Sequence, residues 1–312
     1  MNIYDAVTGV LQQSLPTSET VTKIQASPDG STLFFVHPLC VTMWDVQTGG
    51  LIHTFSTQSE INDIALSTTG DRVACGLADG FVDFWNTRTK RQGRSFGNGQ
   101  LVVTICWPSP MEIVVATQNS VYIHEVASCV TSNTVSIPGR VWGLVYLHDD
   151  EFLVGASDAG KNQEQSFIKT ISRRRLSVVH ERQSPMRLGE LVLQERQSPV
   201  HRRKLTRPTL VGKEVVCVTP SGGVQSFSTE SYDWTNNPPL LNVATSVAVS
   251  LNRNLVVQTK DSIKIFSVDV LTSGEAHNEI QLSRVHRLDK NYAVCLHGSP
   301  YQESITPMDF FL

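Results

Sequence analysis

The sequence predicts an all-β protein built from a repeated four-stranded unit. Three observations lead to this prediction. Similar short stretches recur along the chain, and each divides into four alternating or apolar runs separated by turn residues. No segment of about twelve or more residues keeps a capped helical pattern.

The repeats are clearest at one place near the end of a strand, which we call the Trp position. In the first part of the chain it is held by Tyr4, Trp44, Trp85 and His124. The intervals are 40, 41 and 39 residues, and Phe227 and Phe266 continue the series 39 residues apart. One further repeat is expected around Ile168, with an insertion of about twenty residues in this region. A fixed period of about forty residues is typical of repeat proteins.

Each unit has the same internal order of strands and turns. In the first complete unit, "VTKIQASPDG" alternates, "STLFFVHPL" is apolar, and "CVTMWDVQTGG" and "LIHTFSTQSE" alternate again. In the second unit Asp79-Gly80 marks a tight turn, because glycine tolerates positive φ and aspartate accepts backbone hydrogen bonds. Complete units are expected to begin near residues 20, 60, 100, 140, 187 and 245.

The stretches "SPDG", "MWDVQTG" and "GLADGFVDFWN", together with this period, resemble the WD-repeat β-propeller family with divergent repeats. The resemblance is sharpest over residues 1–90 and implies a ring of four-stranded blades. In that family a network of His, Asp, Ser/Thr and Trp stiffens each blade. Asp79 and Trp85 match two of its positions, and their partners are missing here, so we expect an incomplete network.

The chain ends predict a ring closed by both termini. The segments "MNIYDAVTG" and "LQQSLPTSE" look like the last two strands of a blade, and the tail supplies the first two, of which "YAVCL" is the clearest. Joined, they complete a seven-bladed β-propeller formed by residues 1–312 as a single domain, which leaves no unpaired edge in the ring. "PMDFFL" could instead be an eighth Trp-type strand, in an eight-bladed propeller or in a fragment of a longer protein.

The composition is that of an ordinary globular chain, with 40% hydrophobic and 18% charged residues in 312. No apolar run is long enough for a membrane span, and no secretory signal is visible. The six cysteines, at least 23 residues apart, do not form a zinc motif. We interpret them as buried, reduced thiols of a cytoplasmic or nuclear protein.

No catalytic or cofactor-binding motif is present, so we expect no enzyme activity, no cofactor and no metal. The acidic group Asp149-Asp150-Glu151 reads as a solvated turn. His124 reads as a structural substitute for tryptophan. A Ser/His/Asp triad assembled in space is left open by the sequence, as is an enzymatic site in the central channel.

Residues 161–208 stand out by charge. This segment has 12 Lys and Arg against 4 Asp and Glu, a formal charge of +8, whereas the whole chain has −3. It is either a solvated loop or a surface for an acidic or phosphorylated protein partner. The candidate contact residues are Arg173, Arg174, Arg175, Arg202, Arg203 and Lys204. Nucleic acid is disfavoured as the partner, because Phe167 is the only aromatic residue of this segment on which a base could stack.

The same segment contains candidate phosphorylation sites. Ser177 follows three arginines in "RRRLS", a pattern favoured by basophilic kinases, and Ser184 and Ser198 each precede proline. A phosphate there would neutralise or pair with the neighbouring arginines.

We therefore expect a noncatalytic scaffold for protein–protein interactions. An alternative comes from "FWNTR", which resembles the Trp-Asp-x-Arg motif of WD-repeat substrate receptors of cullin-RING ubiquitin ligases, with Asn86 in place of Asp. In that interpretation Arg88 would contact the ligase adaptor.

Overall fold

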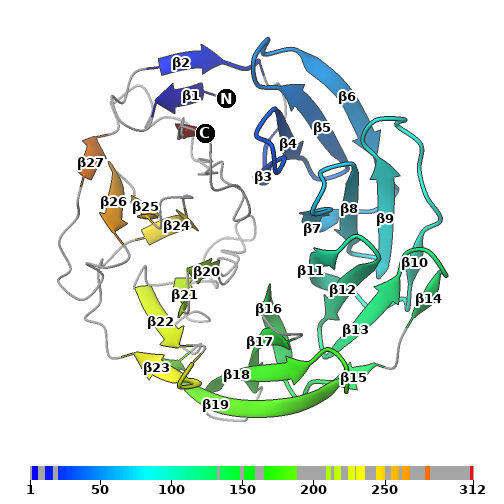
Figure 1. Cartoon of the computed structure of the whole chain (residues 1–312), viewed down its shortest axis with the longest axis vertical. Coiled ribbons are helices and arrows are strands. Elements are labelled where there is room, and N and C mark those ends of the chain that lie inside the picture. Colours follow the sequence, from blue (N-terminus) through cyan, green and yellow to red (C-terminus); the bar gives the residue numbers. More distant parts are fainter. Residues whose placement is uncertain are drawn as a thin grey trace, which may run out of the picture.

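The computed structural model arranges the described strands as a ring of antiparallel sheets (Figure 1). It describes residues 2–5, 11–16, 20–131, 134–147, 151–158, 165–187, 209–211, 214–218, 224–228, 230–235, 244–249, 254–259, 262–267, 278–281 and 310–311. Within these residues no helix is long and apolar enough to cross a membrane.

The described strands form seven sheets, six of which follow one another directly along the chain. The β3–β6 sheet comprises β3 (Lys23–Ala26), β4 (Thr32–Val36), β5 (Cys40–Asp45) and β6 (Leu51–Ser56). The β7–β10 sheet comprises β7 (Ile61–Leu66), β8 (Arg72–Leu77), β9 (Phe81–Asn86) and β10 (Phe96–Gly97). The β11–β15 sheet comprises β11 (Val102–Ser109), β12 (Glu112–Thr117), β13 (Ser120–Glu125), β14 (Val130–Thr131) and β15 (Val135–Ser136).

The next three sheets have four strands each. The β16–β19 sheet comprises β16 (Arg140–Tyr146), β17 (Glu151–Asp158), β18 (Gln165–Ser172) and β19 (Ser177–Arg187). The β20–β23 sheet comprises β20 (Thr209–Val211), β21 (Glu214–Val218), β22 (Val224–Ser228) and β23 (Asp233–Thr235). The β24–β27 sheet comprises β24 (Ala244–Val249), β25 (Asn254–Thr259), β26 (Ser262–Ser267) and β27 (Asn278–Gln281).

The remaining sheet combines the two ends of the chain. It has the order β2 (Leu11–Ser14), β1 (Asn2–Asp5), β28 (Phe310–Phe311). β1 pairs antiparallel with β28, with Tyr4 opposite Phe311 and Asp5 opposite Phe310. The segment "PMDFFL" thus contributes a neighbour to β1, whereas "YAVCL" lies outside the described residues.

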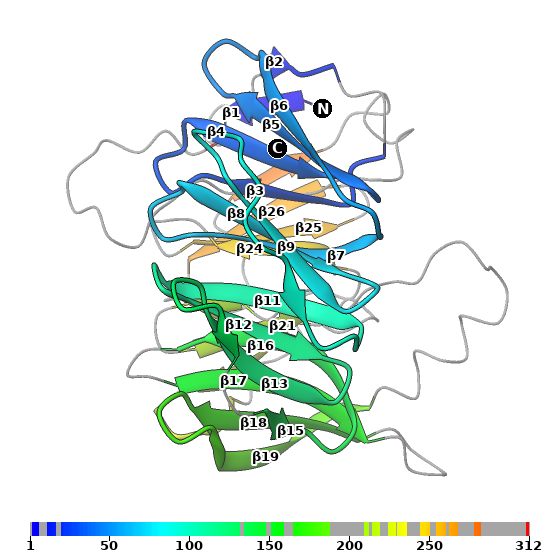
Figure 2. The same cartoon turned by 90° about the vertical axis from the view of Figure 1, so that its right-hand side faces the viewer.

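Apolar cores lie between neighbouring sheets, which stack face against face (Figure 2). Phe34 and Phe35 are adjacent on β4 and point to opposite faces, because side chains alternate along a strand. Phe34 packs with Phe55 and Trp85 toward the β7–β10 sheet, and Phe35 packs with Trp44 toward the β2–β1–β28 sheet. Since both faces are buried, the second strand of a unit reads as a continuous apolar run.

The repeat expected in "SFIKTIS", around Ile168, is confirmed, and its Trp position is Ile171. Ile171 lies opposite Phe152, as Trp44 lies opposite Leu33 and Trp85 opposite Val73. The displacement from Ile168 arises because β18 has eight residues, two more than β5. The fifth unit does not begin near residue 187, because β19 extends to Arg187, and the next described strand begins at Thr209.

Trp85→Ala should lower the free energy of unfolding by about 3–5 kcal/mol, because it removes an indole from between two sheets. Trp85 is only 4% exposed and its ring centroid lies 5.6 Å from that of Phe55. Urea unfolding of the variant would measure the loss. The control Arg88→Ala, three residues away and exposed, should change stability by less than about 0.5 kcal/mol. A Trp85→Ala variant as stable as this control would contradict the packing.

Candidate partner-binding face and the channel

The strands nearest the centre of the ring carry a repeated irregularity (Figure 1). In β7, β11 and β24 the pairing register shifts between the first and third residues of the strand, and in β16 it shifts between the second and fourth. Such a β-bulge leaves one residue without an opposite partner and re-aims the side chains around it. In β7 the bulged residue is Asn62, whose Nδ2 donates to the carbonyl oxygen of Val102 at 3.0 Å. The bulge therefore brings the next residue, Asp63, against the neighbouring strands.

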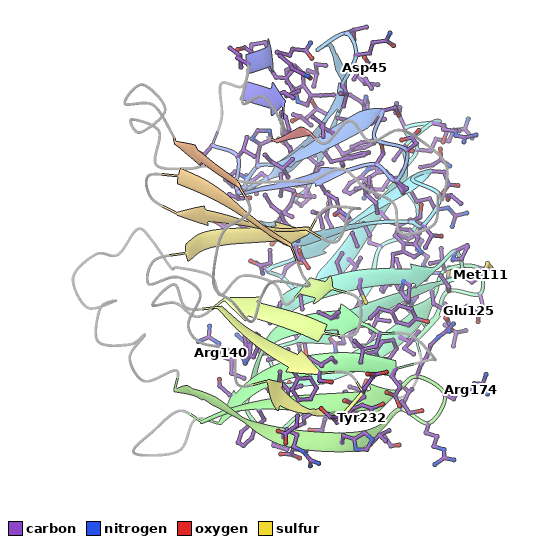
Figure 3. All side chains as sticks on the ribbon, turned by 60° about the vertical axis from the view of Figure 1, so that its left-hand side comes forward. Asp45, Met111, Glu125, Arg140, Arg174 and Tyr232 are labelled. Atoms are coloured by element: carbon purple, nitrogen blue, oxygen red, sulfur yellow. The ribbon has the colours of Figure 1, made fainter. Side chains whose placement is uncertain are left out.

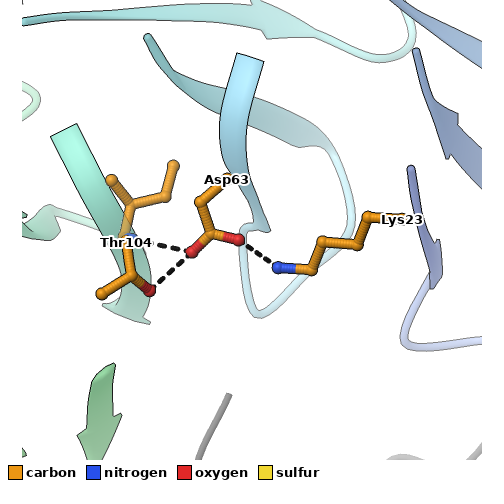
Figure 4. A network of polar contacts seen from close by, with 4 residues as sticks. Lys23, Asp63 and Thr104 are labelled. Carbon is orange, nitrogen blue, oxygen red and sulfur yellow. Dashed lines mark hydrogen bonds and ion pairs between the residues drawn. The ribbon is translucent and has the colours of Figure 1, made fainter. Parts of the chain in front are cut away.

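Asp63 connects the innermost strands of three consecutive sheets (Figure 4). Its Oδ1 accepts a hydrogen bond from Lys23 Nζ of β3, with which it forms an ion pair. Its Oδ2 accepts from Thr104 Oγ1 at 2.6 Å and from the backbone N–H of Ile105 at 2.9 Å, both on β11. Asp63 is 4% exposed, whereas the Lys23 side chain is 31% exposed.

These contacts give the Asp63 carboxylate a structural role. Both oxygens are occupied as acceptors, and a buried carboxylate is stable only when charge and hydrogen-bonding partners compensate for lost water. Within the described residues, no group of three or more His, Cys, Asp or Glu side chains could hold a metal ion. Lys23, Asp63 and Thr104 are each about one repeat apart along the chain. A polar residue that recurs at the same place in successive apolar strands is a sequence signal that could have revealed this network.

One face of the ring carries the turns that follow the Trp positions. Figure 3 places Asp45, Met111, Glu125 and Arg174 along one side of the molecule, with Arg140 away from them. We call this side the turn face. It includes the five turns Asp45–Gly49, Asn86–Lys90, Glu125–Cys129, Ser172–Leu176 and Ser228–Tyr232.

These turns share one backbone geometry. The residue five positions after each Trp position has positive φ, at Gly49 (68°), Lys90 (62°), Cys129 (55°), Leu176 (46°) and Tyr232 (53°). The first residue of the turn accepts from the residue three positions later. Asp45 Oδ1 accepts from Thr48 N at 2.6 Å, Asn86 Oδ1 from Thr89 N at 2.8 Å, and Ser228 Oγ from Ser231 N at 3.2 Å. Such side-chain acceptors hold a turn in place without help from water.

The turns also contact the preceding sheet in the ring. Gly49 lies against Gln13, where a Cβ atom would come within 2.1 Å of the end of the Gln13 side-chain amide, so any other residue would displace this amide. Lys90 Nζ lies 6.0 Å from the ring centroid of Phe55 on β6. Tyr232 donates from its hydroxyl to Glu151 Oε2 at 3.0 Å and stacks on His180 at 4.0 Å.

Arg173, one of the predicted partner-contact residues, makes a contact of the same kind. Its guanidinium forms an ion pair with Glu112 of the preceding sheet, and both side chains are about one quarter exposed (24% and 25%). The predicted contact residue therefore joins two sheets. Arg174 and Arg175 are exposed in the same turn, and Arg88 is exposed in the turn after β9.

The other predicted residues divide between described and undescribed parts of the chain. Ser177 is exposed at the start of β19, and Ser184 lies on the same strand. Ser198, Arg202, Arg203 and Lys204 lie outside the described residues, as does Asp149-Asp150. Cys75 and Cys106 are buried, Cys40 is half-buried, and Cys129 is exposed in its turn, contrary to the prediction of buried thiols.

A hydrogen-bonded network that the sequence did not reveal supports the β3–β6 sheet. Trp44 Nε1 donates to Thr42 Oγ1 at 2.9 Å, and His37 Nε2 lies 3.0 Å from the same hydroxyl. His37 Nδ1 lies 3.2 Å from the carbonyl oxygen of Thr20. In the next sheet Asp79 accepts from the N–H of Phe81 at 3.1 Å within its own turn. Asp79, which the sequence matched to a position of the family's blade network, thus stabilises its own turn.

His124 takes the Trp position of the β11–β15 sheet as a structural residue. Its ring stacks on Phe96 of the preceding sheet, with centroids 3.5 Å apart and planes 6° from parallel. Its Nδ1 lies 3.0 Å from Thr131 Oγ1. Burial lowers the pKa of His124 below the usual 6.5, because a charged ring would lose its water.

The Cys75 thiol is kept protonated by its surroundings. Burial raises its pKa, and the negative charges of Asp83 and Asp63 add to this effect. A thiolate is the reactive form of cysteine, so Cys75 behaves as a small apolar side chain.

Comparison with known proteins identifies the fold. The chain matches no family model, and no curated protein matches it at a significant level. Among solved structures, the β-propeller domain of Cps50 (Swd1) from Myceliophteria thermophila is similar over 93% of this chain and 94% of that chain, with a TM-score of 0.69 and 12% identity. U3-55K is similar over 96% of this chain and 89% of that chain, with a TM-score of 0.67 and 13% identity. The protein therefore has a β-propeller fold.

Unfolding across a pH series should show the effect of His124. Because its pKa is lower in the folded state, its contribution is complete above about pH 6.5 and is lost as pH falls through that value. His124→Phe keeps an aromatic ring against Phe96 and cannot be protonated. The wild type should therefore lose more stability than this variant between about pH 7 and pH 5. If the stability of the wild type and of His124→Phe changed equally with pH, His124 would have the same pKa in the unfolded and folded states.

Proposed function

We propose that this protein is a noncatalytic scaffold that binds other proteins through the turn face of a seven-bladed propeller closed by both termini. The observation that carries the proposal is the combination of fixed turns with exposed charged side chains. Arg174 and Arg175 lie exposed in a turn held by the Leu176 N–H, which donates to the Ser172 carbonyl at 2.8 Å. Rigid loops that present polar side chains are typical of binding surfaces.

Ring closure is part of this proposal, since a binding face needs blades that keep their relative positions. The pairing of β1 with β28 supports it. So do the contacts of Gln13, which in the orientation that satisfies both groups donates to the Val46 carbonyl at 2.8 Å and accepts from the Gly49 N–H at 3.0 Å. These contacts tie the N-terminal strands to the first complete blade. Repeat proteins derive their stability from such contacts between neighbours.

The charge of the turn around Arg174 indicates a partner with an acidic or phosphorylated surface. Arginine contacts carboxylate and phosphate groups with two parallel hydrogen bonds. Ser177 is exposed directly after this turn, so a phosphate on Ser177 would lower the positive charge available to the partner.

Affinity purification of the tagged full-length chain, followed by mass spectrometry, tests the scaffold role. Replacing Arg174 and Arg175 with alanine should lower the yield of at least one stable protein partner several-fold, because it removes two exposed charges from the face. Arg173 is left intact, because its ion pair with Glu112 joins two blades. The matched control is Arg140→Ala, an exposed arginine away from the turn face (Figure 3).

An unchanged set of partners in the double variant would contradict binding through this turn. A tightly bound small molecule without protein partners would favour an enzyme with a site in the channel. Selective loss of a cullin-RING adaptor from Arg88→Ala would favour the substrate-receptor alternative.

A further inference from the structure

A second basic surface lies on the β7–β10 blade, outside the segment 161–208. Residues 87–96, "TRTKRQGRSF", contain four basic residues and no acidic one. Arg88, Arg91 and Arg94 are exposed, and we call them the arginine strip. Among the described residues, the ion pairs involve Lys23, Lys169 and Arg173, and none of them involves the strip.

The backbone holds the strip arginines outward. Lys90 turns inward instead, donating to the Thr87 carbonyl and lying over the Phe55 ring. Gly93 lies against Phe84, where a Cβ atom would come within 2.2 Å of the ring. The strand pairing then skips a residue, since the Gly93 N–H donates to the Phe84 carbonyl and Phe96 lies opposite Val82. Arg94 and Ser95 therefore share the place opposite Asp83, and Ser95 donates a hydrogen bond to that carboxylate.

The nearby carboxylates are occupied by other donors. Asp83 accepts from Ser95, Asp71 accepts from Ser67 and Thr69, and Asp45 accepts from Thr48. For Asp45 and Asp71 these hydrogen bonds contribute to a lowered pKa, in Asp71 together with the charge of Arg72. The ion pairs of the described residues do not include the strip, so its guanidinium groups are available to an anionic group of another molecule.

The adjacent blade favours a protein segment over nucleic acid. Its outer strand β6 exposes Leu51 (52%) and Ile52 (41%) and contains no Asp, Glu, Lys or Arg. Lys90, within residues 87–96, contacts Phe55 on β6, so the two adjacent blades touch at this place. Leu51 and Ile52 are aliphatic, and the blade of the strip itself exposes one aromatic ring, that of Phe81 (44%). Single-stranded nucleic acid is bound by stacking successive bases on several aromatic rings.

We propose that the arginine strip, together with Leu51 and Ile52, binds an acidic segment of a partner protein that also carries aliphatic side chains. This inference rests on the proposed scaffold function and assigns it a second contact surface. The carboxylates would pair with the guanidinium groups, while aliphatic side chains would cover Leu51 and Ile52.

The test is fluorescence anisotropy with the full-length protein and a fluorescein-labelled peptide of alternating Glu and Leu. Replacing Arg91 and Arg94 with alanine should weaken binding by about fivefold and flatten its salt dependence, because two exposed charge contacts are lost. The matched control replaces Arg140 and Arg182, two exposed arginines of the β16–β19 blade, with alanine, and should bind the peptide as the wild type does. A peptide with Gln in place of Glu should bind the wild type much more weakly.

Equal weakening in both double variants would overturn the inference, because attraction would then depend on net charge alone. Tighter binding of a single-stranded DNA of equal charge would overturn it in favour of nucleic acid. Unchanged binding in the Arg91 and Arg94 variant would overturn it too. Unchanged binding in that variant would not contradict the scaffold function, because the scaffold function is tested separately with Arg174, Arg175 and the native partners.

Discussion

The buried carboxylate of Asp63 is the interaction on which the arrangement of the first three complete blades depends. Blades in a propeller touch only their neighbours, so apolar contacts alone allow each pair to adjust independently. Asp63 binds Lys23 on one side and Thr104 and Ile105 on the other. Because a buried charge without its partners is costly, the three inner strands must keep one relative position. The β-bulge at Asn62 directs the side chain of the next residue, Asp63, toward these partners.

The turns after the Trp positions give the outer part of the ring a comparable connection. Each described contact reaches back to the preceding blade, but the chemistry differs from turn to turn. Gly49 lies close to Gln13, and Lys90 contacts the ring of Phe55. Arg173 forms an ion pair with Glu112, and Tyr232 donates a hydrogen bond to Glu151. Since the backbone geometry is shared, the side chains at these places are free to diverge. This explains how a ring can form from repeats that are dissimilar in sequence.

Much of the fold could be predicted from local patterns, because turns and alternating strands leave signals within a few residues. The Trp position was visible at Trp44, Trp85 and His124, and it was lost at Ile171, where a longer strand moved it and the residue is aliphatic. The exposure of Arg88, Arg174 and Arg175 agrees with surface positions.

The pairing of Arg173 with Glu112 could not be predicted, because the residues lie 61 positions apart in different repeats with no shared pattern. The Asp63 contacts span 40 and 41 residues, close to one repeat, so this network was available to a comparison of equivalent positions. The arginine strip was missed beyond Arg88, since the bulge that places both Arg94 and Ser95 opposite Asp83 depends on how two strands pair.

The most direct measurement of the central claim is a double-mutant cycle between Lys23→Met and Thr104→Val, read by urea unfolding. The two side chains belong to blades on either side of Asp63 and share its carboxylate. If that carboxylate couples the blades, the double variant should deviate from additivity by more than about 0.5 kcal/mol, and the deviation should disappear when Asp63→Ala is present. Additive losses in the presence of Asp63 would contradict the account and leave blade packing to apolar contacts alone.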